Sequence, residues 1–351
     1  MPEHSPYQLV YLVYGDNPNY RLEAKFSMLS AIRHGCHPRI LLYTDRPADY
    51  EGWPICVKET DLSTLKDWTG VNGYIHKRKA CAFADALQYA DTSIFIDTDT
   101  FFTASPGRLI HRLSKAQWLV DKTEARFGDW SHLPLYKKTA SYLKESQGVK
   151  DDLLMINSGV LGLRRQQQEI VNSSVEMIDD LCLRAPGIHI IEQFAVAVAA
   201  RRLGKPAEAK GIVCHYYSEK EYWRAVIGTF FSIHGEHWRT NLPEISREAP
   251  TTRPKPDWWF RLALKAKSLF LPKASRRFAR MAYYATHMPD NVYAKSCCQE
   301  YCDAMRKASP ALTKQLQSGN LPNRWRVVLN LESQAALSRM LDPIWSERSV
   351  K

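Results

Sequence analysis

The sequence predicts an α/β protein with a mixed, mostly parallel sheet, because strand patterns alternate with helical ones along the first two thirds of the chain. Short apolar runs typical of strands lie in Tyr7–Gly15, Arg39–Asp45 and the start of Ser93–Phe102. Between the first two, Tyr20–Gly35 has apolar residues at helical spacing and ends at a glycine. Strands joined by crossover helices have helices on both faces of the sheet and bind ligands at their carboxyl ends.

The same alternation continues through the middle of the chain. We expect further strands at Ala116–Asp121, Leu153–Leu163 and Gly211–Tyr217, and further helices at His76–Ala90, Gln166–Arg184 and Ile191–Gly204. A proline- and charge-rich stretch, Asn241–Asp257, is typical of a linker. The sequence therefore predicts an α/β domain over residues 1–245 and a basic, mainly helical region over residues 246–351.

Composition narrows the class of protein. The 351 residues are 45% hydrophobic, which is enough for a sizeable core. The eight cysteines form no CxxC pair, so we expect free thiols. The first residues lack the basic-then-apolar order of a secretory signal, and no apolar run is long enough to span a membrane. We therefore expect a cytoplasmic protein.

Two aspartates in "SIFIDTDTFF" are the strongest indication of a functional site in the sequence. Asp97 and Asp99 follow an apolar strand, one residue apart. Carboxylates are hard oxygen ligands, so the pair is suited to Mg²⁺ or Mn²⁺ that bridges to a diphosphate. Such a short motif also arises where acids only end a strand, and it needs support from other residues.

The same letters fit a second enzyme class. An apolar strand followed by D-x-D-x-T opens the haloacid dehalogenase-like phosphatases, with Asp97 as the nucleophile. Those enzymes usually have this strand near the start of the catalytic core, and they need a later lysine and a second acidic motif. Here two strand and helix units precede Asp97. The later acid pairs, Asp151-Asp152 and Asp179-Asp180, lack the expected glycine setting. The phosphatase remains an alternative.

Further stretches occur in one order around the two aspartates. They are "VYGDNPNYRLEAKFSMLSAI", "KRKACAFADAL", "MINSGVLGL", "IEQFAVAVA" and "CHYYSEKEYW". In this order, over residues 7–223, the chain resembles the sugar-nucleotide glycosyltransferases of the GT-A class. The resemblance is to the retaining branch that includes glycogenin and bacterial lipooligosaccharide galactosyltransferases, and it implies a GT-A, Rossmann-like catalytic domain.

The resemblance implies a role for each matching residue. The nucleoside would be held by four residues that follow the first strand, and the diphosphate by two lysines and Asp97. A metal ion would have two carboxylate ligands and one imidazole ligand, and four residues would have catalytic roles. The nucleotide residues are Tyr14, Asp16, Asn19, Tyr20, Lys79, Asp97 and Lys220; the metal ligands are Asp97, Asp99 and His215; and the catalytic residues are Gln193, Glu192, Asn157 and Asp99.

The last matching stretch departs from the family pattern H-x-x-G-x-x-K-P-W. Ser218 replaces the glycine, Lys220 comes one place early and Tyr222 replaces the proline. His215 thus matches its place in the family pattern, whereas Lys220 is displaced from its place. In addition, "SIHGEHW" offers His234 and His237 as rival ligands.

The implied reaction is metal-dependent transfer of a hexose from a UDP-sugar to a hydroxyl of a glycan or lipid-linked acceptor, with Mn²⁺ or Mg²⁺ as cofactor. The branch implies retention; an inverting enzyme would need a carboxylate base, for which Asp151, Asp152 and Glu192 are candidates. Segment 122–148 would cover the acceptor, with Trp130 and Tyr136 stacking on a sugar or serving as packing residues. A sugar-nucleotide-binding protein without transferase activity is the second alternative.

The positive charge lies in the last part of the chain. Residues 251–351 hold 18 basic and 7 acidic residues, which equals the whole net charge of +11. Within them, residues 255–284 combine eight cations and one acid with several aromatic residues, a composition typical of a segment on an anionic membrane surface. We therefore expect a peripheral protein on the cytoplasmic face of a membrane, in surface polysaccharide or lipopolysaccharide synthesis. The alternative is a helical appendage that packs on the core. We expect no nucleic-acid partner, because no recognised module is present.

Overall fold

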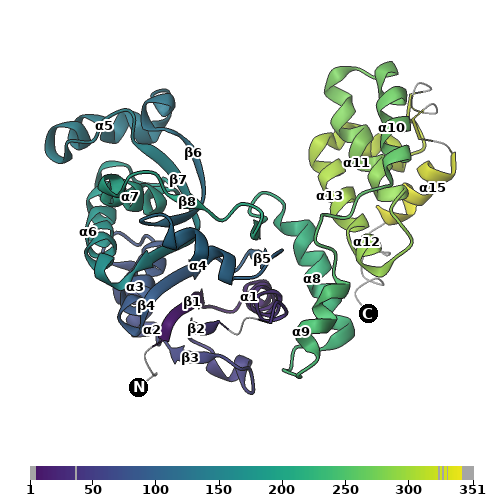
Figure 1. Ribbon diagram of the computed structural model, residues 1–351. Coiled ribbons are helices and arrows are strands. Elements are labelled where there is room, and N and C mark those ends of the chain that lie inside the picture. Colours follow the sequence, from purple (N-terminus) through teal and green to yellow (C-terminus); the bar gives the residue numbers. More distant parts are fainter. Residues whose placement is uncertain (1–4, 36–37, 323–324, 326–327, 330, 342–351) are drawn as a thin grey trace. The chain divides into compact units, whose positions relative to one another are not determined.

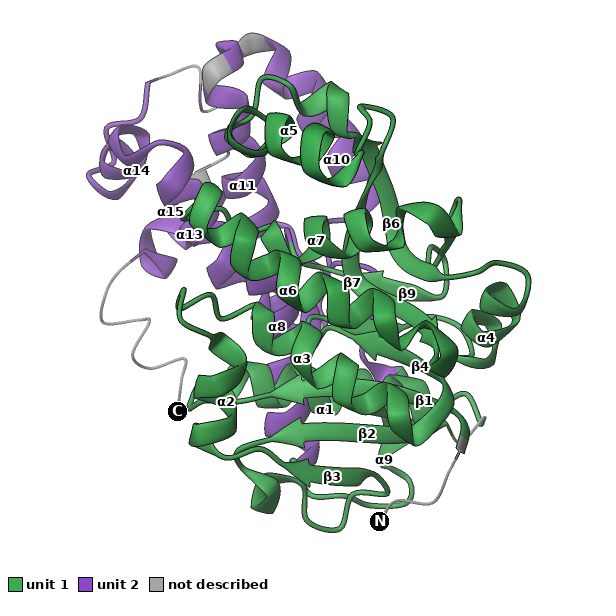
Figure 2. Cartoon of the chain, turned by 90° about the vertical axis from the view of Figure 1, so that its left-hand side faces the viewer, with its two compact units in different colours: residues 1–217, 236–247 green, residues 218–235, 248–351 purple. Residues whose placement is uncertain are grey.

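The computed structural model describes residues 5–35, 38–322, 325, 328–329 and 331–341 (Figure 1). The chain forms two compact units, residues 1–217 with 236–247, and residues 218–235 with 248–351 (Figure 2). The expected boundary after residue 245 lies two residues before the last crossing between the units, and residues 218–235 are grouped with the second unit. Where the independently folding domains begin and end stays a prediction.

A seven-stranded sheet organises the first unit in the order β3-β2-β1-β4-β7-β6-β8. Strands β3, β2, β1 and β4 are parallel, β7 is antiparallel to both of its neighbours, and β8 is parallel to β6. The predicted mixed, mostly parallel sheet is thus confirmed. The strands are β1 (Ser5–Val13), β2 (Arg39–Thr44), β3 (Cys56–Glu59), β4 (Ala90–Ile96), β6 (Leu119–Arg126), β7 (Leu154–Arg164) and β8 (Ala207–Glu208).

Helices pack on both faces of this sheet, as crossover connections require. One face is covered by α3 (Lys77–Ala86), α6 (Gln168–Arg184) and α7 (Ile191–Ala199), where α6 contacts both α3 and α7, and the other face by α1 (Pro18–Ile32) (Figure 1). Helix α1 begins where the Asn17 side chain accepts a hydrogen bond from the Asn19 amide. The other helices of this unit are α2 (Leu62–Thr69), α4 (Gly107–Ser114), α5 (Pro134–Gln147) and α9 (Leu242–Ile245).

The core of the first unit lies between the sheet and its helices. Apolar side chains of neighbouring strands, such as Val10, Phe95 and Leu161, are buried against Phe83 of α3 and Val196 of α7. Burial of this apolar surface is the main favourable term that holds the helices on the sheet. Phe95, near the carboxyl end of β4, is part of this packed cluster, which holds that strand end against α3 and α7.

A second, two-stranded sheet positions His215, the third predicted metal ligand. Strand β5 (Thr100–Phe102) pairs antiparallel with β9 (Val213–His215), with Thr100 opposite His215. Because β5 starts one residue after Asp99, this pairing brings the last residue of β9 to the two aspartates.

The second unit is helical in its described residues. It contains α8 (Lys220–His234), α10 (Trp258–Lys267), α11 (Arg276–Thr286), α12 (Val292–Ser296), α13 (Cys298–Ala308), α14 (Pro310–Gln317) and α15 (Leu331–Met340). Helix α11 packs on α13 and α15, and its core includes Phe278, Tyr301 and Met305. No described helix is long and apolar enough to cross a membrane. The seven cysteines that the structure describes are free thiols, and Cys36 lies outside the described residues.

Candidate active site

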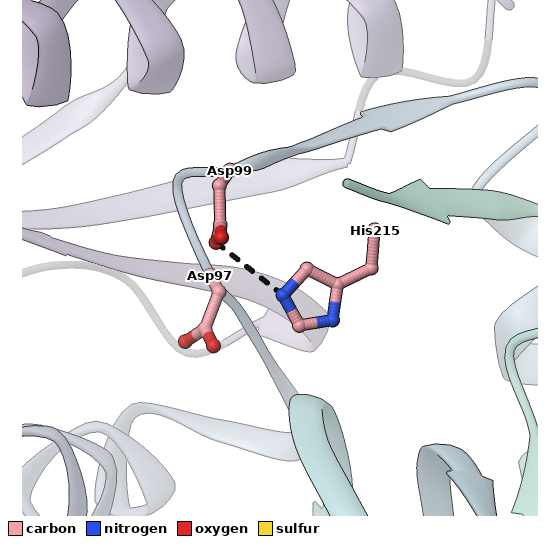
Figure 3. Close-up of side chains that lie close together, drawn as sticks. All are labelled: Asp97, Asp99 and His215. Atoms are coloured by element: carbon pink, nitrogen blue, oxygen red, sulfur yellow. Dashed lines mark ion pairs between the residues drawn. The ribbon is translucent and has the colours of Figure 1, made fainter. Parts of the chain in front are cut away.

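Asp97, Asp99 and His215 come together at the carboxyl end of β4 (Figure 3). One ligand atom of each side chain lies within 4.8 Å of the other two, and His215 Nε2 is 3.4 Å from Asp99 Oδ1. Two carboxylates and an imidazole at this spacing suit a divalent cation such as Mn²⁺. The rival His234 belongs to the second unit, where it pairs with Glu248 of the same unit at 3.2 Å.

Backbone hydrogen bonds hold the turn that carries the two aspartates. The Asp97 amide donates to the Gly159 carbonyl at 2.8 Å, and the Thr100 hydroxyl donates to the Asp97 carbonyl at 2.8 Å. The Tyr216 amide donates to the Asp99 carbonyl at 3.1 Å. The turn is thus tied to β7 on one side and to the end of β9 on the other, which fixes the direction of both carboxylates.

Gly159 is required by the close approach of the His215 ring. A Cβ atom at position 159 would lie 2.2 Å from both Cε1 and Nδ1 of His215. Real Cβ atoms essentially never come so close to another atom, so a side chain here would displace the imidazole. The Asn-Ser-Gly segment of β7 therefore supplies a flat wall against which the ring lies.

Asp121 is a site residue that the sequence analysis missed. Its Oδ2 lies 3.1 Å from His215 Nδ1, and it is buried, on β6. Burial disfavours the charge on His215, but the hydrogen bonds of Asp121 and Asp99 outweigh it and raise the pKa of His215 to about 10. A carboxylate on the far nitrogen of a ligating histidine fixes its ring orientation. The available signal was an acid after an apolar strand, as at Asp97.

Lys79 links the aspartates to a second buried acid. Its ammonium lies 2.8 Å from Asp97 Oδ1 and 4.0 Å from Glu192, and it donates to the Ser158 carbonyl at 2.7 Å. The Ser158 hydroxyl donates to Glu192 Oε2 at 2.8 Å. Burial opposes the charge of Lys79, but Asp97 and Glu192 raise its pKa. Burial raises the pKa of Glu192, and Lys79 opposes that shift.

The remaining catalytic candidates lie beside this network. Glu192 and Gln193 are in the first turn of α7, and Glu192 is buried while Gln193 is half-buried. Asn157 lies on β7, where its side-chain oxygen accepts a hydrogen bond from the Gly159 amide at 2.9 Å. The second oxygen of Glu192 is buried without a hydrogen-bond partner among the described residues. Their catalytic roles stay predictions.

The predicted nucleoside residues lie in the loop after β1 and in the first turn of α1. The Arg78 guanidinium stacks on the Tyr14 ring at 4.6 Å from its centroid. Asp16 is paired with Arg46 at 2.8 Å and Tyr20 is exposed. Asn19 holds the start of α1 through its backbone amide. These positions are compatible with a nucleoside site, and the contact itself stays a prediction.

Three other residues that the sequence analysis named, Lys220, Asp151 and Tyr136, do not belong to the Asp97, Asp99 and His215 cluster. Lys220 is the first residue of α8, in the second unit, so its role stays a prediction. Asp151, a candidate base, is bound by Lys144 and Tyr136 at 2.8 Å each. Tyr136 also packs on Phe127, with 4.6 Å between ring centroids.

The phosphatase alternative needs a second acidic motif at Asp97. Within the described residues, the acids Asp179 and Asp180 are engaged by Lys77 and by Tyr142, respectively. The cluster at Asp97 instead contains Asp99 and His215. Nothing in this arrangement supports the phosphatase alternative.

No family model matches the chain, and no curated protein matches it in sequence. Among solved structures, it is similar to the apo form of mouse xyloside xylosyltransferase 1, with 15% identity, 57% of this chain and 84% of that chain covered, and a TM-score of 0.38. Apo glycosyltransferase GlyE of Streptococcus pneumoniae matches with 12% identity, coverage of 70% and 63%, and a TM-score of 0.41. Galactosyltransferase LgtC in complex with donor and acceptor sugar analogues matches with 11% identity. That alignment covers 92% of this chain and 100% of that chain, with a TM-score of 0.39. Identity and TM-score are low throughout, so the functional argument rests on the geometry of the site.

Proposed function

We propose that this protein is a metal-dependent glycosyltransferase that moves a hexose from a nucleotide-sugar, a UDP-sugar, to a hydroxyl of an acceptor. The observation that carries the proposal is the Asp97, Asp99 and His215 cluster at the carboxyl end of β4, next to the buried Lys79. A cation site with an adjacent ammonium group is what a diphosphate leaving group requires. The order of the family motifs along the chain gives independent support.

Asp97, Asp99 and His215 would hold Mn²⁺ or Mg²⁺, and a nitrogen ligand beside two carboxylates favours Mn²⁺. When bound, the ion would act as a Lewis acid on the diphosphate. Asp121 would keep the His215 ring in the orientation that presents Nε2 to this site. Lys79 would contribute positive charge beside the phosphates, and Lys220 is proposed for the same role.

Glu192, Gln193 and Asn157 would act on the sugar. The unpartnered, buried oxygen of Glu192 is available to accept a hydrogen bond from a sugar hydroxyl. Ser158 and Lys79 hold the other oxygen of Glu192 in place, so this acceptor is oriented before the sugar binds. Gln193 would lie near the anomeric carbon. We propose net retention of the anomeric configuration, in line with the retaining branch.

We further propose that the acceptor is a glycan or a lipid-linked glycan of surface polysaccharide or lipopolysaccharide synthesis. The protein would act on the cytoplasmic side and bind the membrane peripherally through residues 255–284. The support for this part is the basic, aromatic composition of that segment.

A turnover assay tests the transferase proposal. Release of UDP from UDP-glucose, UDP-galactose and related donors is measured with Mn²⁺, with excess chelator, and in the Asp99→Ala variant. The Asp67→Ala variant, which removes an exposed carboxylate on α2, is the matched control. We expect slow donor hydrolysis that needs Mn²⁺, is lost in Asp99→Ala and is retained in Asp67→Ala. Absence of hydrolysis with every donor would favour a binding protein without transferase activity.

The stereochemistry is tested separately once an active donor is known. Nuclear magnetic resonance of the fresh product reports the anomeric configuration before mutarotation. The same configuration as in the donor supports retention, and the opposite configuration overturns it. An inverted product would direct mutagenesis to Asp151, Asp152 and Glu192 as candidate bases.

A further inference from the structure

The segment that joins the two sequence regions forms a pocket in the second unit. The stretch "PTTRPKPDWWFR" runs into α10, and together with the turn before α12 it encloses a cavity of about 460 Å³. Four prolines line it, at positions 250, 254, 256 and 289. Proline fixes the backbone φ angle, so the walls of this cavity lose little conformational freedom when a ligand binds.

Three cations and one acid contribute to the lining of the pocket. Arg253, Lys255 and Arg261 contribute to its wall, while Asp257 is the acid among its described lining residues. Burial and the neighbouring Arg253 lower the pKa of Lys255, and Glu219 opposes that shift. Like charges are thus gathered here with incomplete compensation, which a bound anion would relieve.

One of these cations is held in place before any ligand binds. Arg253 pairs with Glu219 at 2.8 Å, and its guanidinium lies over the Tyr222 ring, 4.7 Å from the centroid, and the Tyr301 ring, at 5.8 Å. Its Nε atom is buried without a hydrogen-bond partner among the described residues. A guanidinium held in this way presents a fixed positive charge to the pocket that it lines, which suits a phosphate group.

Exposed indole rings lie beside the cations. Trp258 lines the pocket although 53% of its surface is exposed, and it stacks on Trp259, which is 64% exposed, with 3.6 Å between the ring centroids. Phe260 and Leu262, on the same first turns of α10, are also exposed. Tryptophan is enriched where a protein meets the boundary between lipid head groups and acyl chains.

We infer that this pocket binds the phosphate of an anionic phospholipid head group, while Trp258 and Trp259 enter the boundary region of the bilayer. Cations in a fixed pocket and exposed indoles directly beside it match the two parts of one lipid, a phosphate and an apolar chain. The pocket thus converts a general attraction of the basic second region into a defined head-group site. The inference rests on the membrane binding proposed above for residues 255–284, but it is separable from the transferase activity, because its readout is lipid binding.

Vesicle co-sedimentation of the full chain tests the site with two charge reversals on one helix. Arg261 lines the pocket, whereas Lys265, one turn further along α10, is exposed and does not. With phosphatidylglycerol vesicles, we expect Arg261→Glu to weaken binding about tenfold or more and Lys265→Glu by less than about threefold. Phosphatidylcholine vesicles should bind weakly. Equal losses in both variants, or no preference for phosphatidylglycerol, would overturn the head-group site.

A soluble probe separates the phosphate from the bilayer. Glycerol 3-phosphate should bind the wild type in calorimetry and displace it from vesicles, and Arg261→Glu and the milder Arg261→Gln should both weaken this binding. Trp259→Ala should lower vesicle binding and leave glycerol 3-phosphate binding unchanged. Thermal unfolding identifies any variant that has lost its fold. A wild type that binds glycerol 3-phosphate but no phosphatidylglycerol vesicle would overturn the lipid assignment.

Discussion

The His215 ring lies directly against the backbone of Gly159, and a Cβ atom there would be 2.2 Å from two atoms of the imidazole. This contact joins β7 of the main sheet to β9 of the small sheet. The two strands meet next to the turn that carries Asp97 and Asp99. The position of the third ligand thus depends on the absence of a side chain at one residue of another strand.

Substitution of this glycine should remove the third ligand without removing the fold. We expect Gly159→Ala to displace His215 and to weaken Mn²⁺ binding by about tenfold or more, measured by calorimetry. Gly162→Ala is the matched control on the same strand, because its Cβ would meet Leu119 and Leu113 instead. The control should lose some stability and keep Mn²⁺ affinity. Unchanged affinity in Gly159→Ala would show that His215 is not a ligand.

Asp121→Asn should weaken metal binding although Asp121 is not one of the three ligands. The amide keeps the shape of the side chain and removes the negative charge 3.1 Å from His215 Nδ1. Loss of such a partner typically lowers metal affinity by about 10- to 100-fold. Asp129→Asn, at an exposed acid shortly after β6, is the control. Equal Mn²⁺ affinity in Asp121→Asn and the wild type would exclude the supporting role.

Lys79 should stabilise the fold in addition to its proposed role beside the phosphates of the donor. Its removal in Lys79→Met leaves Asp97 and the buried Glu192 without their shared cation, which should lower the free energy of unfolding by about 3–5 kcal/mol. Urea unfolding measures this loss. The additional change Glu192→Gln removes one uncompensated charge, so the double variant should be more stable than Lys79→Met alone. A double variant that is less stable would contradict the proposed coupling.

Glu236 should make stability depend on pH. It pairs with Arg21 and with Lys25, which is 3% exposed, at 3.0 Å each. Burial opposes the charge of Glu236, but these two cations outweigh it and lower its pKa. The ion pairs therefore stabilise the fold above the unfolded-state pKa of about 4.3, and this contribution is lost as pH falls through the lower folded-state value.

Glu236→Gln tests this dependence. At pH 7 we expect a loss of about 1–3 kcal/mol in urea unfolding, because Lys25 is left buried without its carboxylate. The difference from the wild type should shrink as pH falls below the unfolded-state value. Glu244→Gln, which breaks an exposed pair with Arg247, should cost less than about 1 kcal/mol. A difference that stays constant with pH would contradict the assignment of the charge to Glu236.

Local patterns in the sequence predicted much of the fold. The strand at β4, the helix at α6 and the long strand at β7 were expected within two or three residues of their observed ends. Their apolar runs are long enough for periodicity to identify them. In contrast, β8 has two residues and β3 has four mostly exposed ones, so neither leaves a usable pattern.

Helix α5 was not predicted from the sequence, for a different reason. It lies in the segment expected to cover the acceptor, and a threonine and an alanine are among its few buried residues, which are Leu135, Thr139, Ala140 and Leu143. Strand β6 also continues five residues beyond the predicted end at Asp121. Both features depend on packing against α6 and β7, which a local pattern does not contain.

Only part of the candidate site could be predicted from the sequence. A strand followed by two acids indicated Asp97 and Asp99, and the family resemblance pointed to His215. The contact between Asp121 and His215 joins residues 94 positions apart and depends on how β5, β9 and β6 meet. Long-range pairing of this kind has no local signal, so the residue that orients the imidazole emerged only from the structure.

The most direct test of the central claim is a calorimetric titration of UDP with Mn²⁺, without metal, and with the Asp99→Ala variant. The account predicts binding with Mn²⁺ that is strongly weakened without metal and lost in Asp99→Ala. Absence of UDP binding under every condition, or binding that is indifferent to both Mn²⁺ and Asp99, would contradict a metal-dependent sugar-nucleotide site at the end of β4.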